Sequence, residues 1–163
     1  HEALDGSGFP AGKKGAEIGL AARIVAVVNR YDRLCHPESA EVRPMVPTHA
    51  LKRLWQEKDT RFDARILAAM VSLLGVYPPG TIVSLSDGSL ALVLSPGTDS
   101  RTPKVLIYDP AVAKADAPVV DLGETAGVTI EEALLPEDIP EEAVKWISPR
   151  ERLTYFFASD TLT

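Results

Sequence analysis

Cysteine is nearly absent from this chain of 163 residues, in which Cys35 is the only one. A single cysteine excludes a disulfide within the chain and suits a reducing compartment. We expect its thiol to behave as a small apolar group near a helix end. Long apolar runs are also missing, because the most apolar helical stretch, residues 20–28, is interrupted by Arg23 and is too short to cross a bilayer. These absences favour a cytoplasmic protein with no membrane segment in this chain.

Positive charge is in deficit, with 17 Lys and Arg residues against 23 Asp and Glu residues and a formal net charge of −6. Proteins that bind nucleic-acid backbones usually present a basic face, so we expect no DNA or RNA partner. The charge is segregated, because basic side chains concentrate in the first 33 residues whereas residues 124–142 are strongly acidic. Binding of one small anionic ligand is compatible with this pattern.

Apolar residues recur at helical spacing in three stretches of the first half of the chain, at residues 17–34, 47–58 and 62–74. Pro47 stands at the first turn of the second stretch, where a helix tolerates proline, and Thr48 can help to cap it. Gly75 and the Pro-Pro-Gly turn at 78–80 end the third stretch. The first half of the chain therefore predicts three helices.

Beyond residue 77 the pattern changes to short strands. Residues 81–86 and 89–95 flank Asp87-Gly88, a dipeptide typical of a tight β-hairpin. Residues 104–108 and 118–122 are two further strand candidates, which gives a small antiparallel sheet of four strands. The acidic segment 124–145 predicts a loop and a short helix, and Ser148 with Pro149 predicts the start of a terminal helix. The fold class is therefore α+β.

The chain opens with the string His-Glu-Ala-Leu-Asp-Gly-Ser-Gly-Phe-Pro. A neutral imidazole such as that of His1 is a good ligand for iron, manganese or zinc. The loop that follows must turn sharply, since Gly6 and Gly8 allow positive φ angles and Pro10 fixes the exit of the chain. On the residues alone, His1 is more typical of a surface position than of a metal ligand, and the loop is more typical of a structural turn than of a site.

A polar pair interrupts the apolar side of the first predicted helix. Ala22, Val25, Asn29 and Asp32 lie at i, i+3, i+7 and i+10 and so form one stripe. Asn29 and Asp32 are one turn apart on it. They are candidates either for a polar site or for hydrogen bonds at a contact between helices.

The opening string resembles the signature of the HD-GYP family, bacterial metal-dependent phosphodiesterases that hydrolyse cyclic di-GMP. That signature usually reads His-His-Glu, two residues, then Asp-Gly-x-Gly-Tyr-Pro. The similarity continues at Gly12, Gly15, Ile18, Arg23, the helix to Leu34, Phe62-Asp63 and residues 74–78. The family's His-Asp dyad is not in the chain, and we expect it to lie before residue 1. The chain is thus identified as a C-terminal portion that begins inside the motif.

The resemblance implies three parts. Residues 1–76 would be the C-terminal part of a mainly helical domain like those of the HD superfamily. Residues 77–123 would form the small antiparallel β subdomain, similar to an extension of some HD-GYP domains. Residues 124–163 would form an acidic loop and a C-terminal helix.

The resemblance also implies roles for residues of the opening string. His1 would be a metal ligand and, with Asp5, part of the catalytic site. Gly6, Gly8, Phe9 and Pro10 would form a loop that shapes the substrate site and contacts partners. Phe9 replaces the family's tyrosine, which removes a hydroxyl group but keeps the ring, and we expect a mild effect.

Two basic or polar positions on the helix take their expected roles from the family as well. Asn29 stands where members commonly have an aspartate that binds metal, so its carbonyl oxygen would be a ligand without negative charge. The intact domain would hold two or three divalent ions, with iron or manganese expected, and the neutral Asn29 leaves their number and identity open. Arg23 would pair with Asp5 or contact a phosphate.

The family's Arg-Pro-Tyr-Arg segment, which helps to hold the nucleotide phosphates, is not matched after Leu34. The chain has Cys-His-Pro-Glu at 35–38 and Val-Arg-Pro-Met at 42–45 instead. Arg33 or Arg43 is therefore a candidate phosphate contact. His36 and His49 have no ligand partner at a recognisable spacing, and we expect both on the surface.

Three functions remain open at this point. The intact protein could hydrolyse cyclic di-GMP to pGpG, GMP or both, with this fragment inactive on its own. It could instead be a degenerate HD-GYP regulatory module that binds a protein partner such as a diguanylate cyclase domain, which Asn29 and the altered phosphate segment favour. The retention of His1, Asp5 and both loop glycines favours catalysis. A plain helical domain with a β appendage would require the opening motif to be a coincidence.

Overall fold

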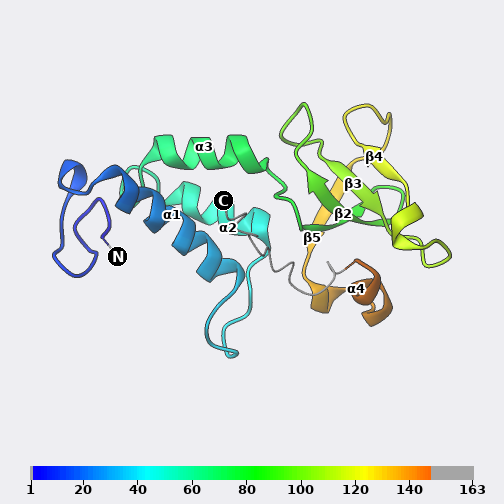
Figure 1. Ribbon diagram of the computed structural model, residues 1–163, viewed down its shortest axis with the longest axis horizontal. Helices are drawn as coiled ribbons and strands as arrows, with labels where there is room; N and C mark the ends of the chain where they lie inside the picture. The colour runs from blue at the N-terminus through cyan, green and yellow to red at the C-terminus, as the bar shows by residue number, and fades with distance from the viewer. Residues whose placement is uncertain (1, 148–163) are drawn as a thin grey trace, which may run out of the picture.

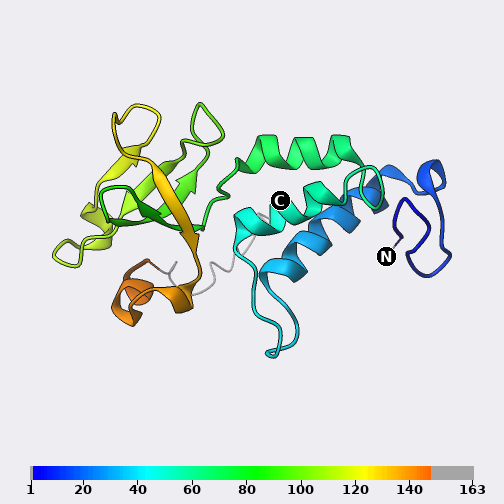
Figure 2. The same ribbon diagram turned by 180° about the vertical axis from the view of Figure 1, so that it is seen from behind.

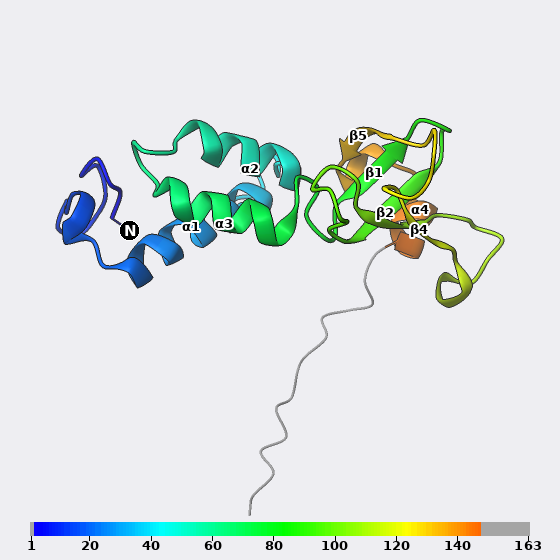
Figure 3. The same cartoon turned by 90° about the horizontal axis from the view of Figure 1, so that it is seen from above.

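The computed structural model describes residues 2–147. The first three helices gather in one half of an elongated molecule, and the strands lie in the other half together with the short helix at residues 141–147 (Figure 1). The views from behind and from above show the same separation of these three helices from the sheet (Figures 2 and 3). This arrangement confirms the predicted α+β class and the order of helices before strands.

The helical half consists of α1 (Leu20–Cys35), α2 (Pro47–Gln56) and α3 (Ala64–Leu74), preceded by the 3₁₀ turn η1 (Gly15–Glu17). All three predicted helices are confirmed, although α1 begins after Gly19 because residues 15–17 form the separate turn. The three helices bury a shared apolar core around Val27, Leu54 and Leu67. No helix in the described part of the chain is long and apolar enough to cross a bilayer.

The sheet contains β1 (Ile82–Leu85), β2 (Leu90–Ser95), β3 (Lys104–Ile107), β4 (Val119–Asp121) and β5 (Ile130–Leu134), in the order β4-β3-β2-β1-β5. Every neighbouring pair is antiparallel. The predicted hairpin is confirmed, with β1 and β2 joined through Gly88. Gly88 has a φ of 83°, which glycine adopts at little energetic cost.

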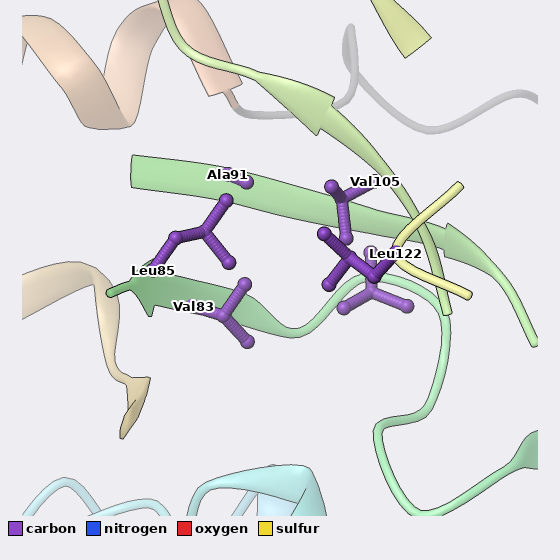
Figure 4. Packing of buried hydrophobic residues seen from close by; sticks show 6 residues of the cluster. Val83, Leu85, Ala91, Val105 and Leu122 are labelled. Atoms are coloured by element: carbon purple, nitrogen blue, oxygen red, sulfur yellow. The ribbon is translucent and has the colours of Figure 1, made fainter. Parts of the chain in front are cut away.

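Both faces of the sheet are covered, as the alternation of side chains along a strand allows. One face buries a cluster that includes Val83, Leu85, Ala91, Val105 and Leu122, whose side chains converge in Figure 4. The other face packs Ile82, Leu92 and Leu106 against Ile147 of helix α4 (Glu141–Ile147) and against Ala117, next to the turn η2 (Lys114–Asp116).

The strand β5 corrects the sequence prediction, which gave four strands and assigned the acidic segment to a loop and a short helix. The short helix is present as α4, and the turn η3 (Pro136–Asp138) precedes it, but residues 130–134 pair with β1 along its whole length. Glu131 and Glu132 are exposed on this strand, so its acidic composition hides its structural role. The terminal helix predicted from Ser148 lies outside the described residues.

An ion pair joins the beginnings of α1 and α3. Arg23 Nη1 donates to Asp63 Oδ2 at 2.9 Å, and Arg23 Nε donates to the carbonyl oxygen of Ile18 at 2.7 Å. The Asp63 side chain is only 10% exposed and also accepts from the backbone N–H of Arg65, which caps α3. Asp63 therefore fixes both the start of α3 and its position beside α1.

We predict that Asp63→Ala lowers the free energy of unfolding at pH 7 by about 1 kcal/mol or more, the usual cost of losing a helix cap. Hydrogen bonds from the side chain and backbone of Arg65, supported by Arg23, lower the pKa of Asp63 below its value in an unfolded chain. The carboxylate therefore stabilises the fold above that unfolded value, and its contribution disappears as the pH falls through the folded value.

Urea denaturation at pH 7 and at pH 3 measures this difference, with the exposed Glu124→Gln as the control. The gap between wild type and Asp63→Ala should shrink at pH 3. An equal gap at both pH values would show that the carboxylate charge is not what stabilises the helix start.

Candidate functional site

A hollow of about 620 Å³ lies beside α1, where the chain's opening segment meets the middle of that helix. Asn29, Arg30 and Arg33 line it from α1, Glu2 lines it from the opening segment, and Arg61 lines it from the turn before α3. Residues that are distant in sequence are thus gathered around one space. The helix stripe supplies this geometry, because Ala26, Asn29, Arg30 and Arg33 lie at i, i+3, i+4 and i+7.

Glu2 holds the glycine loop in place. Its two carboxylate oxygens accept hydrogen bonds from the backbone N–H groups of Ala11, at 2.8 Å, and Lys13, at 2.9 Å. The backbone N–H of Leu4 also donates to the carbonyl oxygen of Arg61 at 3.1 Å. The loop is therefore tied to the wall of the hollow at both of its ends.

This role of Glu2 was missed by sequence reasoning, which treated the residue as part of a motif only. A carboxylate that directly precedes a glycine-rich loop, whose backbone N–H groups lack strand or helix partners, was the available signal. Charge-assisted hydrogen bonds of this kind are stronger than neutral ones, so Glu2 is well suited to order the loop.

The loop itself turns at Gly6 rather than at both predicted glycines. Gly6 has a φ of 82°, and a Cβ atom there would lie 2.6 Å from the side chain of Lys14. The second positive φ, 60°, falls on Gly12 and not on Gly8. Pro10 follows a cis peptide bond at the exit of the loop, and the ring of Phe9 is 74% exposed.

Asp5 is exposed and does not line the hollow. Its carboxylate accepts a hydrogen bond from the backbone N–H of Ser7 at 2.8 Å, and hydrogen bonds from Ser7 lower the pKa of Asp5. In this structure Asp5 stabilises the turn of the loop. Its expected catalytic role stays a prediction.

Only one of the two expected metal ligands, Asn29, lies among the described residues. His1 lies outside the described residues, and Asn29 is on the wall of the hollow. Residues 2–147 contain no group of three or more His, Cys, Asp or Glu side chains that could hold a metal ion. Asn29 fits as one oxygen donor, but the described residues do not by themselves form a metal site.

Two arginines that the sequence suggested as phosphate contacts, Arg23 and Arg43, form ion pairs outside the hollow. Arg23 pairs with Asp63 rather than with Asp5, and it does not line the hollow. Arg43 donates to Glu137 at 2.5 Å and to Asp138 at 2.9 Å, both in the turn η3, and it is also absent from the hollow. Of the two candidate phosphate contacts, Arg33 and Arg43, only Arg33 reaches the hollow.

The remaining histidines and the cysteine behave as predicted. His36 and His49 are exposed, and His36 lies 3.1 Å from the Asp32 carboxylate along α1. Asp32 is exposed and does not reach the hollow with Asn29. Cys35 is buried near the end of α1, and burial raises the pKa of its thiol, so it is an unreactive packing residue.

Comparisons with known proteins indicate the family of the chain. Residues 1–66 match a family described as HD domain. The chain is 36% identical over 132 residues to the cyclic di-GMP phosphodiesterase PA4108 of Pseudomonas aeruginosa, which covers 79% of this chain and 31% of that protein. It is 26% identical over 127 residues to the cyclic di-GMP phosphodiesterase PdeB of Borreliella burgdorferi, with 78% of this chain and 32% of that protein covered. A probable cyclic di-GMP phosphodiesterase of Vibrio cholerae is 38% identical over 72 residues, or 44% of this chain and 16% of that protein.

The helical half is thus part of an HD domain. More particularly, the match to the HD domain and the likeness to cyclic di-GMP phosphodiesterases support the HD-GYP family assignment that the opening motif predicts. Phosphodiesterases with HD domains generally depend on divalent metal ions. The chain spans about a third of the length of the first two relatives, and no solved structure matches it significantly.

We predict that Glu2→Ala loosens the glycine loop without unfolding the helices. Amide hydrogen exchange at Ala11 and Lys13 should become about tenfold faster, as expected for the loss of a charge-assisted hydrogen bond of 1.5 kcal/mol or so. Exchange in α2 should not change, and the exposed Glu131→Gln serves as the control. Unchanged exchange at both amides would contradict the role given to Glu2.

Proposed function

We propose that the intact protein is a phosphodiesterase that hydrolyses cyclic di-GMP to pGpG, GMP or both. The observation that carries this proposal is the hollow in which Asn29, three arginines and the segment directly after His1 meet. A phosphodiester needs positive charge around its oxygens when it is attacked, and this hollow supplies it from side chains that belong to different elements. The relatives named as cyclic di-GMP phosphodiesterases support the choice of substrate.

The chain's own residues would bind and position the substrate. The arginines would hold the phosphates, and the loop tied down by Glu2 would form one side of the site, with Gly6, Gly8, Phe9 and Pro10 against the nucleotide or a partner. Such a site works by orienting the substrate and by charge, so a loop held in one conformation would help to orient the substrate. The catalytic acid–base residues would come from His1, Asp5 and the part of the domain outside this chain.

We also propose that iron or manganese ions, two or three in number, are held by His1, Asn29 and ligands outside this chain. Divalent ions in such sites polarise phosphoryl oxygens and lower the pKa of bound water. Asn29 contributes an oxygen without negative charge, so this site should hold its ions less tightly than one with an aspartate. A cytoplasmic location fits the single buried cysteine, Cys35.

The alternative is a regulatory module that has lost hydrolysis and binds a protein partner such as a diguanylate cyclase domain. The exposed ring of Phe9, at the tip of an ordered loop, favours this reading, because exposed aromatic groups are frequent anchors of protein interfaces. The two functions are separated by measuring turnover.

We predict that the intact protein, loaded without oxygen with iron or manganese, converts cyclic di-GMP to linear products resolved by chromatography. His1→Ala should reduce turnover at least about 100-fold, since even indirect partners of metal sites cost 10–100-fold. His49→Ala, which removes an exposed histidine, should leave turnover unchanged. The 163-residue fragment should show none. Absence of turnover in metal-loaded wild type would favour the regulatory module.

We predict that Asn29→Asp in the intact protein raises the affinity for the divalent ion by about tenfold or more, because a carboxylate replaces a neutral oxygen. Competition with a coloured chelator measures the affinity without any reliance on activity. Asp32→Asn, one turn away on α1, is the matched control and should have no effect. Equal affinities of wild type and Asn29→Asp would show that this position does not bind metal.

A further inference from the structure

We propose that Arg30, Arg33 and Arg61 form a phosphate-binding wall that determines how tightly the hollow holds a phosphodiester ligand. This inference rests on the proposed function and assigns its substrate contacts. Arg30 and Arg33 stand on one face of α1 with Asn29, and Arg61 approaches from the turn before α3. The guanidinium groups thus belong to two different walls of the same space.

The balance of charge in the hollow is positive. Of the two carboxylates that line it, Glu2 is engaged by the backbone N–H groups of Ala11 and Lys13. Glu38 is 78% exposed and lies 3.6 Å from Arg33. An exposed ion pair of this length contributes little, so Arg33 can exchange it for a ligand at low cost.

Arg61 is in a similar position. Its Nη1 lies 3.5 Å from Oε2 of Glu57, whose other oxygen, Oε1, accepts a hydrogen bond from Arg53 Nε. The side chain of Arg61 is 44% exposed. One carboxylate is therefore shared between two arginines. The positive charge of Arg61 is only partly neutralised, so Arg61 can still bind an anion.

Arg30 gives the most specific indication. Its Nε atom is buried and has no hydrogen-bond partner, and no carboxylate in residues 2–147 forms an ion pair with it. A buried donor without an acceptor is costly, and an oxygen of a ligand in the hollow would satisfy it. The planar guanidinium fork matches the spacing of two phosphate oxygens.

A phosphodiester with two anionic groups fits these features better than a single carboxylate does. Three arginines on two walls can bind two separated phosphates. The neutral side chain of Asn29 does not repel these anionic groups. The hollow of about 620 Å³ is in the range of pockets for small ligands, roughly 300–1,000 Å³. The ligand class is therefore a cyclic or linear dinucleotide bound through its phosphates.

The test uses the intact protein with cyclic di-GMP and compares Arg30→Ala, Arg33→Ala and Arg61→Ala with the exposed Arg101→Ala as control. Each of the three should raise KM by about tenfold, the usual effect of losing a charged hydrogen bond, with kcat within about twofold of wild type. Arg33→Lys keeps the charge but not the fork and should recover part of the loss. Because Arg33 and Arg61 are exposed, these two variants keep the test valid if Arg30→Ala fails to fold.

Values of KM for all three variants equal to that of Arg101→Ala, in an active enzyme, would overturn this inference and leave the proposed function intact. If wild type shows no turnover, the proposed function fails separately, and calorimetric titration with cyclic di-GMP then tests the wall. Binding that weakens in the three variants and not in Arg101→Ala would still support the arginine wall, and equal binding or no binding would refute it.

Discussion

The ion pair between Arg23 and Asp63 is the constraint on which the geometry of the site depends. It fixes the first turn of α1 against the start of α3, and Arg23 adds a bond to the carbonyl oxygen of Ile18. The hollow is bounded by α1 on one side and by Arg61, two residues before Asp63, on the other. The distance between its walls is therefore set at this pair. The dipeptide Phe62-Asp63 thus combines core packing by the ring with alignment of the helices by the carboxylate.

The sequence was sufficient to predict features that are encoded locally. The three helices follow from apolar spacing, and the β1–β2 hairpin follows from Asp87-Gly88. The structure places Asn29 on the wall of a hollow, but its role as a metal ligand, taken from the family motif, stays a prediction. In each case the necessary residues lie within a few turns or one hairpin of each other.

Features that depend on distant residues could not be predicted in the same way. Arg23 and Asp63 are 40 residues apart, and nothing in the pattern selected Asp63 over Asp5. Arg61 joins the hollow only because the chain folds back after α2. The strand β5 was missed because Glu131 and Glu132 dominate its composition, whereas its membership of the sheet is decided by the free edge of β1.

Two groups of cations in the helical half are used differently. The arginines of the hollow are paired weakly or not at all with carboxylates, whereas Arg43 is engaged by Glu137 and Asp138 of the β half. The acidic segment therefore pairs with Arg43, whereas the arginines around Asn29 have only long ion pairs or none among the described residues. This accounts for the coexistence of a net negative chain with a positive hollow.

The position of β5 has a consequence for how the chain is completed during synthesis. The last strand of the described residues pairs with the first, so β1 remains an open edge until residue 134 has left the ribosome. Open edges with unpaired backbone groups are sites where strands of other chains can add. Glu131 and Glu132 are exposed on β5, and such charges on a strand disfavour its pairing with strands of other chains before it joins β1.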